Sequence, residues 1–96
     1  MVAALDTKNR VISISNISTG TLDASLVHPR EVFRFAIAEG SSSILLAHNH
    51  PSGDPTPSRE DHAVTRRLTE AGKTLGIDVL DNIVVGFTAV SIQEAM

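Results

Sequence analysis

The sequence contains no cysteine, which excludes a disulfide framework, a thiolate metal site and a cysteine nucleophile. The same absence excludes the zinc deaminases, whose metal site needs a Cys-x-x-Cys pair. No apolar run approaches the roughly 20 residues of a membrane span. The N-terminus shows no basic segment followed by an apolar core, which a signal peptide would need. We therefore expect a cytoplasmic protein that does not associate with membranes.

Aromatic and basic residues are also scarce. The chain has three Phe, no Tyr, no Trp, eight Lys plus Arg, and a formal net charge of −3. Proteins that bind duplex DNA draw most of their non-specific affinity from clustered cations. Proteins that bind single strands usually add aromatic side chains on which bases stack. We therefore do not expect a nucleic acid as a partner of this chain.

The rest of the composition is that of an ordinary globular domain. Hydrophobic residues make up 42% of the sequence and charged residues 20%. A chain of 96 residues is long enough for one modest core. We expect a single domain over residues 1–96.

The apolar pattern predicts an α/β protein. Residues 2–5 and 11–16 form a predicted hairpin, because the second segment alternates apolar and polar residues as a half-buried strand does. Residues 24–27 form a short extended piece, residues 43–47 a central strand, and the segments 79–80, 83–85 and 89–90 closing strands that Gly86 interrupts as a turn.

Two helices separate these strands. Pro29 suits the first turn of a helix, and Gly40 is a suitable C-terminal cap for it. Ser58 opens the longest helix, which Gly76 ends. The order of elements predicts an α/β sandwich with a mixed sheet.

A cluster of potential metal ligands follows the central strand. His48 and His50 are two positions apart, so an extended strand end directs both imidazoles to the same side. A Pro/Gly-rich turn then brings Asp61 onto the first turn of the next helix. Two imidazoles and one carboxylate are the three protein ligands of a catalytic-type zinc site, whose fourth position stays open.

Each of these residues also has a purely structural interpretation. A His-x-His pair can simply be polar residues at the end of a strand. Ser58-x-x-Asp61 has the form of a capping box, in which the acidic residue supports the start of the helix. The two interpretations of Asp61 are compatible, because one carboxylate oxygen can cap the helix while the other faces a metal.

The spacing of these residues resembles a known family. His48-x-His50, ten intervening residues and then Asp61, with Ser58 three positions before it, is similar to the JAMM (MPN/JAB) metalloprotease signature. The fuller string His-Asn-His-Pro-Ser-Gly resembles the bacterial RadC branch. Further RadC-like segments in RadC order extend the resemblance over essentially the whole chain: Leu5-Asp6-Thr7-Lys8-Asn9, Gly20-Thr21, Val27-His28-Pro29-Arg30-Glu31 and 80–86.

The resemblance implies a fold and a function. The fold is a cytidine-deaminase-like three-layer α-β-α sandwich with a mixed, mainly antiparallel sheet. The function is zinc-dependent hydrolysis of a peptide or isopeptide bond, with His48, His50 and Asp61 as metal ligands. Ser58 would be catalytic and donate to the oxyanion of the tetrahedral intermediate; its structural alternative is a plain N-cap. The partners implied are a peptide or protein substrate and, as an option, a second copy in a homodimer.

One part of the JAMM mechanism has no match in the chain. The general base of that mechanism is a Glu, which in RadC-like sequences sits just before the first strand, upstream of the position of Met1. We therefore expect the domain to be truncated at its N-terminus. Glu31 and Glu39 are the nearest substitutes in sequence, but neither matches the motif.

Four other residues near the matched motifs have expected positions. His28 is expected at a cap or on the surface, and His62 faces solvent because it is rotated about 100° from Asp61 on the helix. Asp81 either orients a ligand imidazole or lies in a turn. Asn82 stands where RadC-like sequences commonly have a His, so a supporting role at this position is in doubt.

Three functions compete. The first is the zinc hydrolase that the JAMM resemblance implies. The second is a DNA repair or recombination accessory role without protease activity, which low basicity and few aromatic residues disfavour here. The third is a non-catalytic scaffold, which the retained His48, His50 and Asp61 disfavour.

Overall fold

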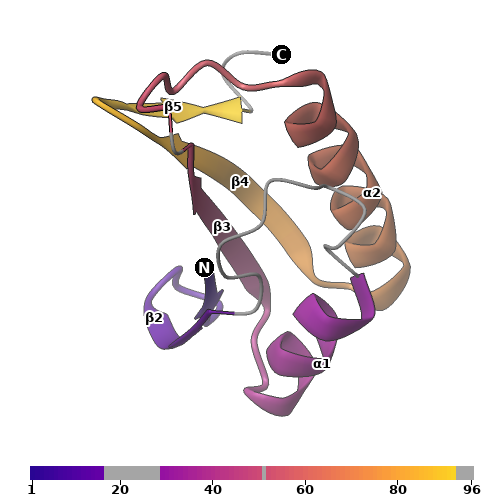
Figure 1. Ribbon diagram of the computed structural model, residues 1–96. Helices are drawn as coiled ribbons and strands as arrows, with labels where there is room; N and C mark the ends of the chain where they lie inside the picture. The colour runs from indigo at the N-terminus through magenta and orange to yellow at the C-terminus, as the bar shows by residue number, and fades with distance from the viewer. Residues whose placement is uncertain (17–28, 51, 93–96) are drawn as a thin grey trace.

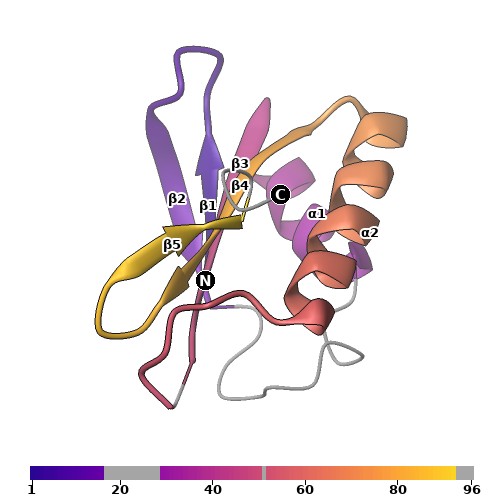
Figure 2. The same ribbon diagram turned by 90° about the horizontal axis from the view of Figure 1, so that it is seen from above.

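The computed structural model describes residues 1–16, 29–50 and 52–92. In chain order their elements are β1 (Val2–Leu5), β2 (Val11–Ser15), α1 (Pro29–Ala38), β3 (Ser43–Asn49), α2 (Arg59–Leu75), β4 (Asp78–Val85) and β5 (Ala89–Ser91). The strands form one sheet in the order β2-β1-β3-β4-β5 (Figure 1; β1 is labelled in Figure 2). The β3–β4 pair is parallel and the other pairs are antiparallel, which confirms the predicted mixed, mainly antiparallel sheet.

Both described helices lie on the same face of this sheet (Figures 1 and 2). Val32 and Phe33 of α1 and Leu68 of α2 pack into one buried core with Ile44 and Leu46 of β3. The predicted α/β class is therefore confirmed. Within residues 1–16, 29–50 and 52–92, no helix covers the opposite face, where the three-layer arrangement places its third layer. The predicted extended piece at 24–27 lies outside the described residues.

The predicted helix ends are confirmed. Helix α1 begins at Pro29, and Ser58 is the N-cap of α2. Gly76 ends α2 in the left-handed conformation with φ of 75°, and its N–H donates to the Gly72 carbonyl. This conformation suits glycine because it has no Cβ to clash.

Neither α1 nor α2 is both long and apolar enough to cross a membrane.

Strand β2 alternates as predicted, but its isoleucines lie on the more exposed side of the strand. Ile12 and Ile14 are 44% and 57% exposed, while Ser13 and Ser15 are half-buried. The pairing explains this result. Ser15 lies opposite Val2, which faces the helices, whereas Ile14 lies opposite Ala3 and faces the other side of the sheet. Among the described elements, no helix covers that side.

The last long strand is continuous, where two strands were predicted. Strand β4 runs through Asp81, so the expectation of a turn at this residue is wrong. A register shift skips Leu80: Ile44 pairs with Val79, and Leu46 pairs with Asn82. Ile44 and Leu46 share the helix-facing side, so Val79 and Asn82 also share it although they are three positions apart. A β-bulge changes the side to which later residues point, and here it turns Asn82 towards α2.

Ile44 and Ile14 lie in different environments, so the same substitution to valine should lower the free energy of unfolding by different amounts. Ile44→Val removes a methyl group from a side chain with no exposed surface and should cost about 0.5–1.5 kcal/mol of unfolding free energy. Ile14→Val, at a site that is 57% exposed, should stay within about 0.5 kcal/mol of the wild type. Urea unfolding followed by circular dichroism would measure both. Equal costs would contradict the assignment of the helix-facing side as the core.

Candidate metal centre

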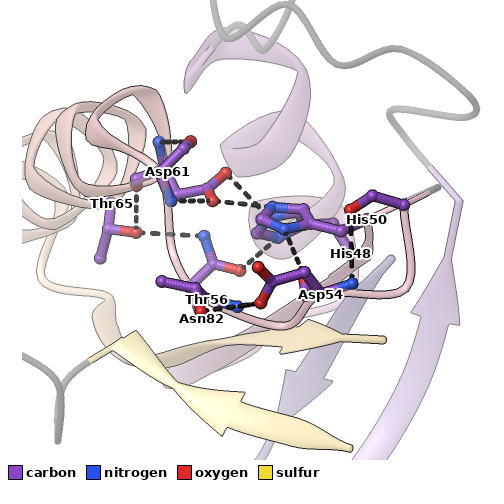
Figure 3. Close-up of polar contacts among 9 residues, drawn as sticks. His48, His50, Asp54, Thr56, Asp61, Thr65 and Asn82 are labelled. Carbon is purple, nitrogen blue, oxygen red and sulfur yellow. Dashed lines mark hydrogen bonds and ion pairs between the residues drawn. The ribbon is translucent and has the colours of Figure 1, made fainter. Parts of the chain in front are cut away.

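Three potential ligands meet where β3 ends and α2 begins (Figure 3). His48 lies in β3, and His50 follows directly after this strand. The His50 backbone N–H donates to the Val85 carbonyl at 3.0 Å, which continues the parallel pairing with β4. Asp61 lies in the first turn of α2. One ligand atom from each of the three side chains lies within 4.8 Å of the others, so the structure brings together the set that the sequence spacing predicted.

The Asp61 carboxylate is part of a capping box and also faces both imidazoles. Its Oδ2 accepts the Ser58 N–H at 2.7 Å, and the Ser58 hydroxyl accepts the Asp61 N–H at 3.1 Å. Oδ1 lies 2.9 Å from Nε2 of His48, and Oδ2 lies 2.8 Å from Nε2 of His50. The Asp61 carboxylate therefore caps the helix and faces both imidazoles at once, and Oδ2 takes part in both arrangements.

The surroundings of Asp61 favour its charged form. Burial raises the pKa of this carboxyl group. The Ser58 N–H, the charge of His48, the Ser58 hydroxyl and the charge of His50 together outweigh burial and hold the pKa of Asp61 below its usual value. The carboxylate is therefore ionised at neutral pH and can serve as a metal ligand.

Both imidazoles have a partner behind the ring, on the side away from Asp61. Nδ1 of His50 lies 2.9 Å from the Asp54 carbonyl oxygen. A carbonyl oxygen only accepts hydrogen bonds, so Nδ1 of His50 carries the hydrogen and donates. Nδ1 of His48 lies 3.1 Å from Oδ1 of Asn82, which is also an acceptor. With the hydrogen on Nδ1, neutral rings present bare Nε2 lone pairs to the Asp61 carboxylate.

This arrangement calls for a cation. Two nitrogen lone pairs and a carboxylate repel one another unless a positive charge lies between them, either a proton on each imidazole or one shared metal ion. Two imidazole nitrogens and one carboxylate oxygen form the donor set of catalytic zinc sites, and a partner behind each ligating imidazole is their usual arrangement.

The loop between β3 and α2 is anchored to the turn between β4 and β5. The Phe87 N–H donates to the Gly53 carbonyl at 2.6 Å. A Cβ on Gly86 would come within 2.1 Å of the same carbonyl oxygen, so only glycine allows this approach. Because Asp54 follows Gly53 directly, this contact also positions the carbonyl that holds His50.

The Asp54 side chain closes a small turn of its own. Its Oδ1 accepts the Thr56 N–H at 3.0 Å and the Thr56 hydroxyl at 2.7 Å. The Thr56 N–H and then its hydroxyl lower the pKa of Asp54 below the usual value; burial opposes this effect and the charge of His50 adds to it. The turn stiffens the segment that supports the His50 ring.

The other candidate residues lie apart from this group. Glu31 is exposed and lines a separate surface hollow with Ser15, Arg34, Phe35 and Ala38. Glu39 is exposed just after the last residue of α1. His62, expected to face solvent, is half-buried and is not a member of the three-residue group. His28 lies outside the described residues.

The acceptors behind the imidazoles differ from those expected. Asp81 accepts the Ser91 hydroxyl and the Asn82 N–H, whereas His48 and His50 are held by Asn82 and by the Asp54 carbonyl. The expectation that Asp81 orients a ligand imidazole is therefore wrong, and the supporting role doubted for Asn82 is present. The bulge at Leu80 decides which of the two residues faces the site.

Two groups that support the imidazoles, the Thr65 side chain and the Asp54 carbonyl, were not predicted from the sequence. Thr65 links Asn82 to the backbone of α2; its only signal was a Thr at a core-facing position, four residues after Asp61. The Asp54 carbonyl has no signal in the sequence, because every residue has a backbone carbonyl.

The fold and the site define an α/β domain in which three residues that could hold a metal ion meet at the carboxyl end of a parallel strand pair. The chain matches the RadC-like JAB domain over all of residues 1–96, and it belongs to this family. It is 64% identical to a UPF0758 protein of Alkaliphilus metalliredigens over 85 residues, 88% of this chain and 37% of that protein. It is 61% identical to a UPF0758 protein of Symbiobacterium thermophilum over 85 residues, covering 88% of this chain and 36% of the relative. A UPF0758 protein of Methanosarcina mazei is 58% identical over 82 residues, which are 85% of this chain and 36% of that protein. The chain thus spans little more than a third of the length of these relatives.

The close approach of Gly53 and Gly86 predicts a sensitive position outside the ligand set. Gly86→Ala should push the loop away from the β4–β5 turn and cost about 1–3 kcal/mol of unfolding free energy, the usual range for overpacking. Thr88→Ala, at an exposed residue of the same turn, is the matched control and should stay within about 0.5 kcal/mol of the wild type. Thermal unfolding would measure both variants. If Gly86→Ala is as stable as Thr88→Ala, the loop is not anchored at this point.

Proposed function

We propose that this domain is a zinc-dependent hydrolase of the JAMM type that cleaves a peptide or isopeptide bond. The observation that carries the proposal is the convergence of two imidazole Nε2 atoms on the Asp61 carboxylate, each ring with an acceptor behind its Nδ1. Membership of the RadC-like JAB domain family supports the same function.

The ligand residues and Ser58 would divide the work. A zinc ion held by His48, His50 and Asp61 would supply Lewis acidity and lower the pKa of water. The Ser58 hydroxyl accepts the Asp61 N–H and its hydrogen stabilises the Asp61 carboxylate, so in catalysis this hydrogen would turn from Asp61 to the oxyanion of the substrate. Loss of one such donor typically costs about 3 kcal/mol of transition-state stabilisation.

A proton carrier is the remaining requirement. Asp61 is the one carboxylate in the three-residue group, and as a ligand it is not available as a base. Glu31 and Glu39 are exposed on or beside α1, which disfavours both as substitutes. We propose that the base is a Glu contributed by sequence that precedes Met1 in a longer form of the protein, as the resemblance to JAMM proteases implies.

Zinc binding tests the ligand set directly. The wild type should bind one zinc ion in calorimetric titration, and His50→Ala should weaken binding by more than the roughly 10–100-fold that loss of an outer-shell partner costs. His62→Ala is the matched control, because this imidazole neighbours Asp61 but lies outside the group; its affinity should equal that of the wild type. Equal affinities of the wild type and His50→Ala would sink the assignment.

Hydrolysis tests the proton carrier. The 96-residue chain should bind zinc but cleave peptides poorly, because loss of a general base typically slows a reaction by about 10²–10⁴-fold. A form extended upstream to include the Glu should regain that factor. Rates on a panel of peptide and isopeptide substrates would compare the two forms.

A chelator and His50→Ala, applied to the extended form, are the controls for metal dependence. If the short form is as active as the extended form, the base lies within residues 1–96, and Glu31 and Glu39 become the candidates.

A further inference from the structure

Two buried polar side chains connect the imidazole of His48 to helix α2. Asn82 is 4% exposed and Thr65 is 1% exposed, among the most buried polar residues described. Oδ1 of Asn82 lies 3.1 Å from Nδ1 of His48, and Nδ2 of Asn82 donates to the Thr65 hydroxyl at 3.1 Å. The Thr65 hydroxyl in turn donates to the Asp61 carbonyl at 2.8 Å. Figure 3 shows this chain of contacts behind the site.

The Thr65 hydroxyl decides how the amide of Asn82 is oriented. A hydroxyl has one hydrogen, and here the Asp61 carbonyl takes it. Only lone pairs remain for Asn82, so the amide must turn its NH₂ group towards Thr65 and its oxygen towards His48. The reverse orientation would place two acceptors, the amide oxygen and the hydroxyl lone pair, against each other between two buried side chains.

We propose that Thr65 and Asn82 are positioning residues of the metal centre, which together fix His48 in the tautomer that presents a bare Nε2. The amide oxygen accepts from Nδ1–H, so Nε2 keeps its lone pair and points at Asp61. The inference rests on the proposed zinc site. It assigns a role to Thr65, which touches neither imidazole and acts through Asn82.

These polar contacts form a closed ring that begins and ends at Asp61. The Asp61 carboxylate contacts His48, His48 contacts Asn82, Asn82 contacts Thr65, and Thr65 donates to the Asp61 carbonyl. Two ligands from different elements, β3 and α2, are thereby tied to one hydrogen-bond network. Such a network rigidifies a site when all of its members are satisfied.

Helix α2 contains a matched control. The Thr69 hydroxyl donates to the Thr65 carbonyl at 2.8 Å, the same bond to the residue four positions earlier that Thr65 makes to Asp61. Thr65→Val and Thr69→Val therefore remove the same local bond, but only Thr65→Val removes the partner of Asn82. Thr65→Ser keeps the hydroxyl and is the conservative rescue.

Zinc affinity and the ring tautomer are the two measurements. Thr65→Val should weaken zinc binding by about 10–100-fold, the usual effect of losing an outer-shell partner, while Thr65→Ser and Thr69→Val should stay within about threefold. Nitrogen-15 NMR of the metal-free protein should show a hydrogen on Nδ1 of His48 in the wild type. The Nε2–H form should appear in Thr65→Val and not in Thr69→Val.

The outcomes separate this inference from the proposed function. If the wild type binds no zinc, the proposed function fails, and the NMR tautomers alone decide the role of Thr65. If the wild type binds zinc but Thr65→Val and Thr69→Val behave alike, or if His48 of the wild type carries its hydrogen on Nε2, the inference is overturned. Should Thr65→Val not fold, Asn82→Asp presents an oxygen to His48 whatever Thr65 does. It should keep the Nδ1–H tautomer, and loss of that tautomer would contradict the inference.

Discussion

The Asp61 carboxylate is the group on which the start of α2 and the candidate metal centre both depend. One oxygen accepts the Ser58 N–H and thereby fixes the N-terminus of the helix, and both oxygens face imidazoles that arrive from β3. An N-terminal cap is ordinarily worth about 1 kcal/mol, so the helix start is well defined without a metal. The position of one ligand is thus set by the local folding of the chain, before the other two contribute.

The parallel pairing of β3 and β4 sets the rest of the site. Parallel strands end at the same edge of the sheet, and α2, which connects these two strands, begins at that edge. Ligand sites in α/β proteins commonly lie at the carboxyl ends of parallel strands. The bulge at Leu80 then turns Asn82 rather than Asp81 towards the helix. An irregularity of one residue in β4 therefore selects an uncharged amide as the partner of His48.

The sequence predicted what depends on local chemistry and failed where a long-range contact decides. The ends of α2 at Ser58 and Gly76 and the grouping of His48, His50 and Asp61 follow from capping preferences and from spacing, which are local. The side on which Ile12 and Ile14 lie depends instead on which face of the sheet the helices cover. The choice between Asp81 and Asn82 depends on a bulge that only the pairing with β3 reveals.

The two imidazoles are supported in physically different ways. His48 is held by Asn82, which is held in turn by Thr65. Both of these side chains are almost fully buried, so the support of His48 is as stable as the core. His50 is held by a main-chain carbonyl in a loop whose place depends on the contact between Gly53 and Gly86. Loop segments open locally at lower free energy than core elements. Of the two imidazoles, His50 is therefore the one whose support opens at lower free energy, while the support of His48 stays fixed with the core.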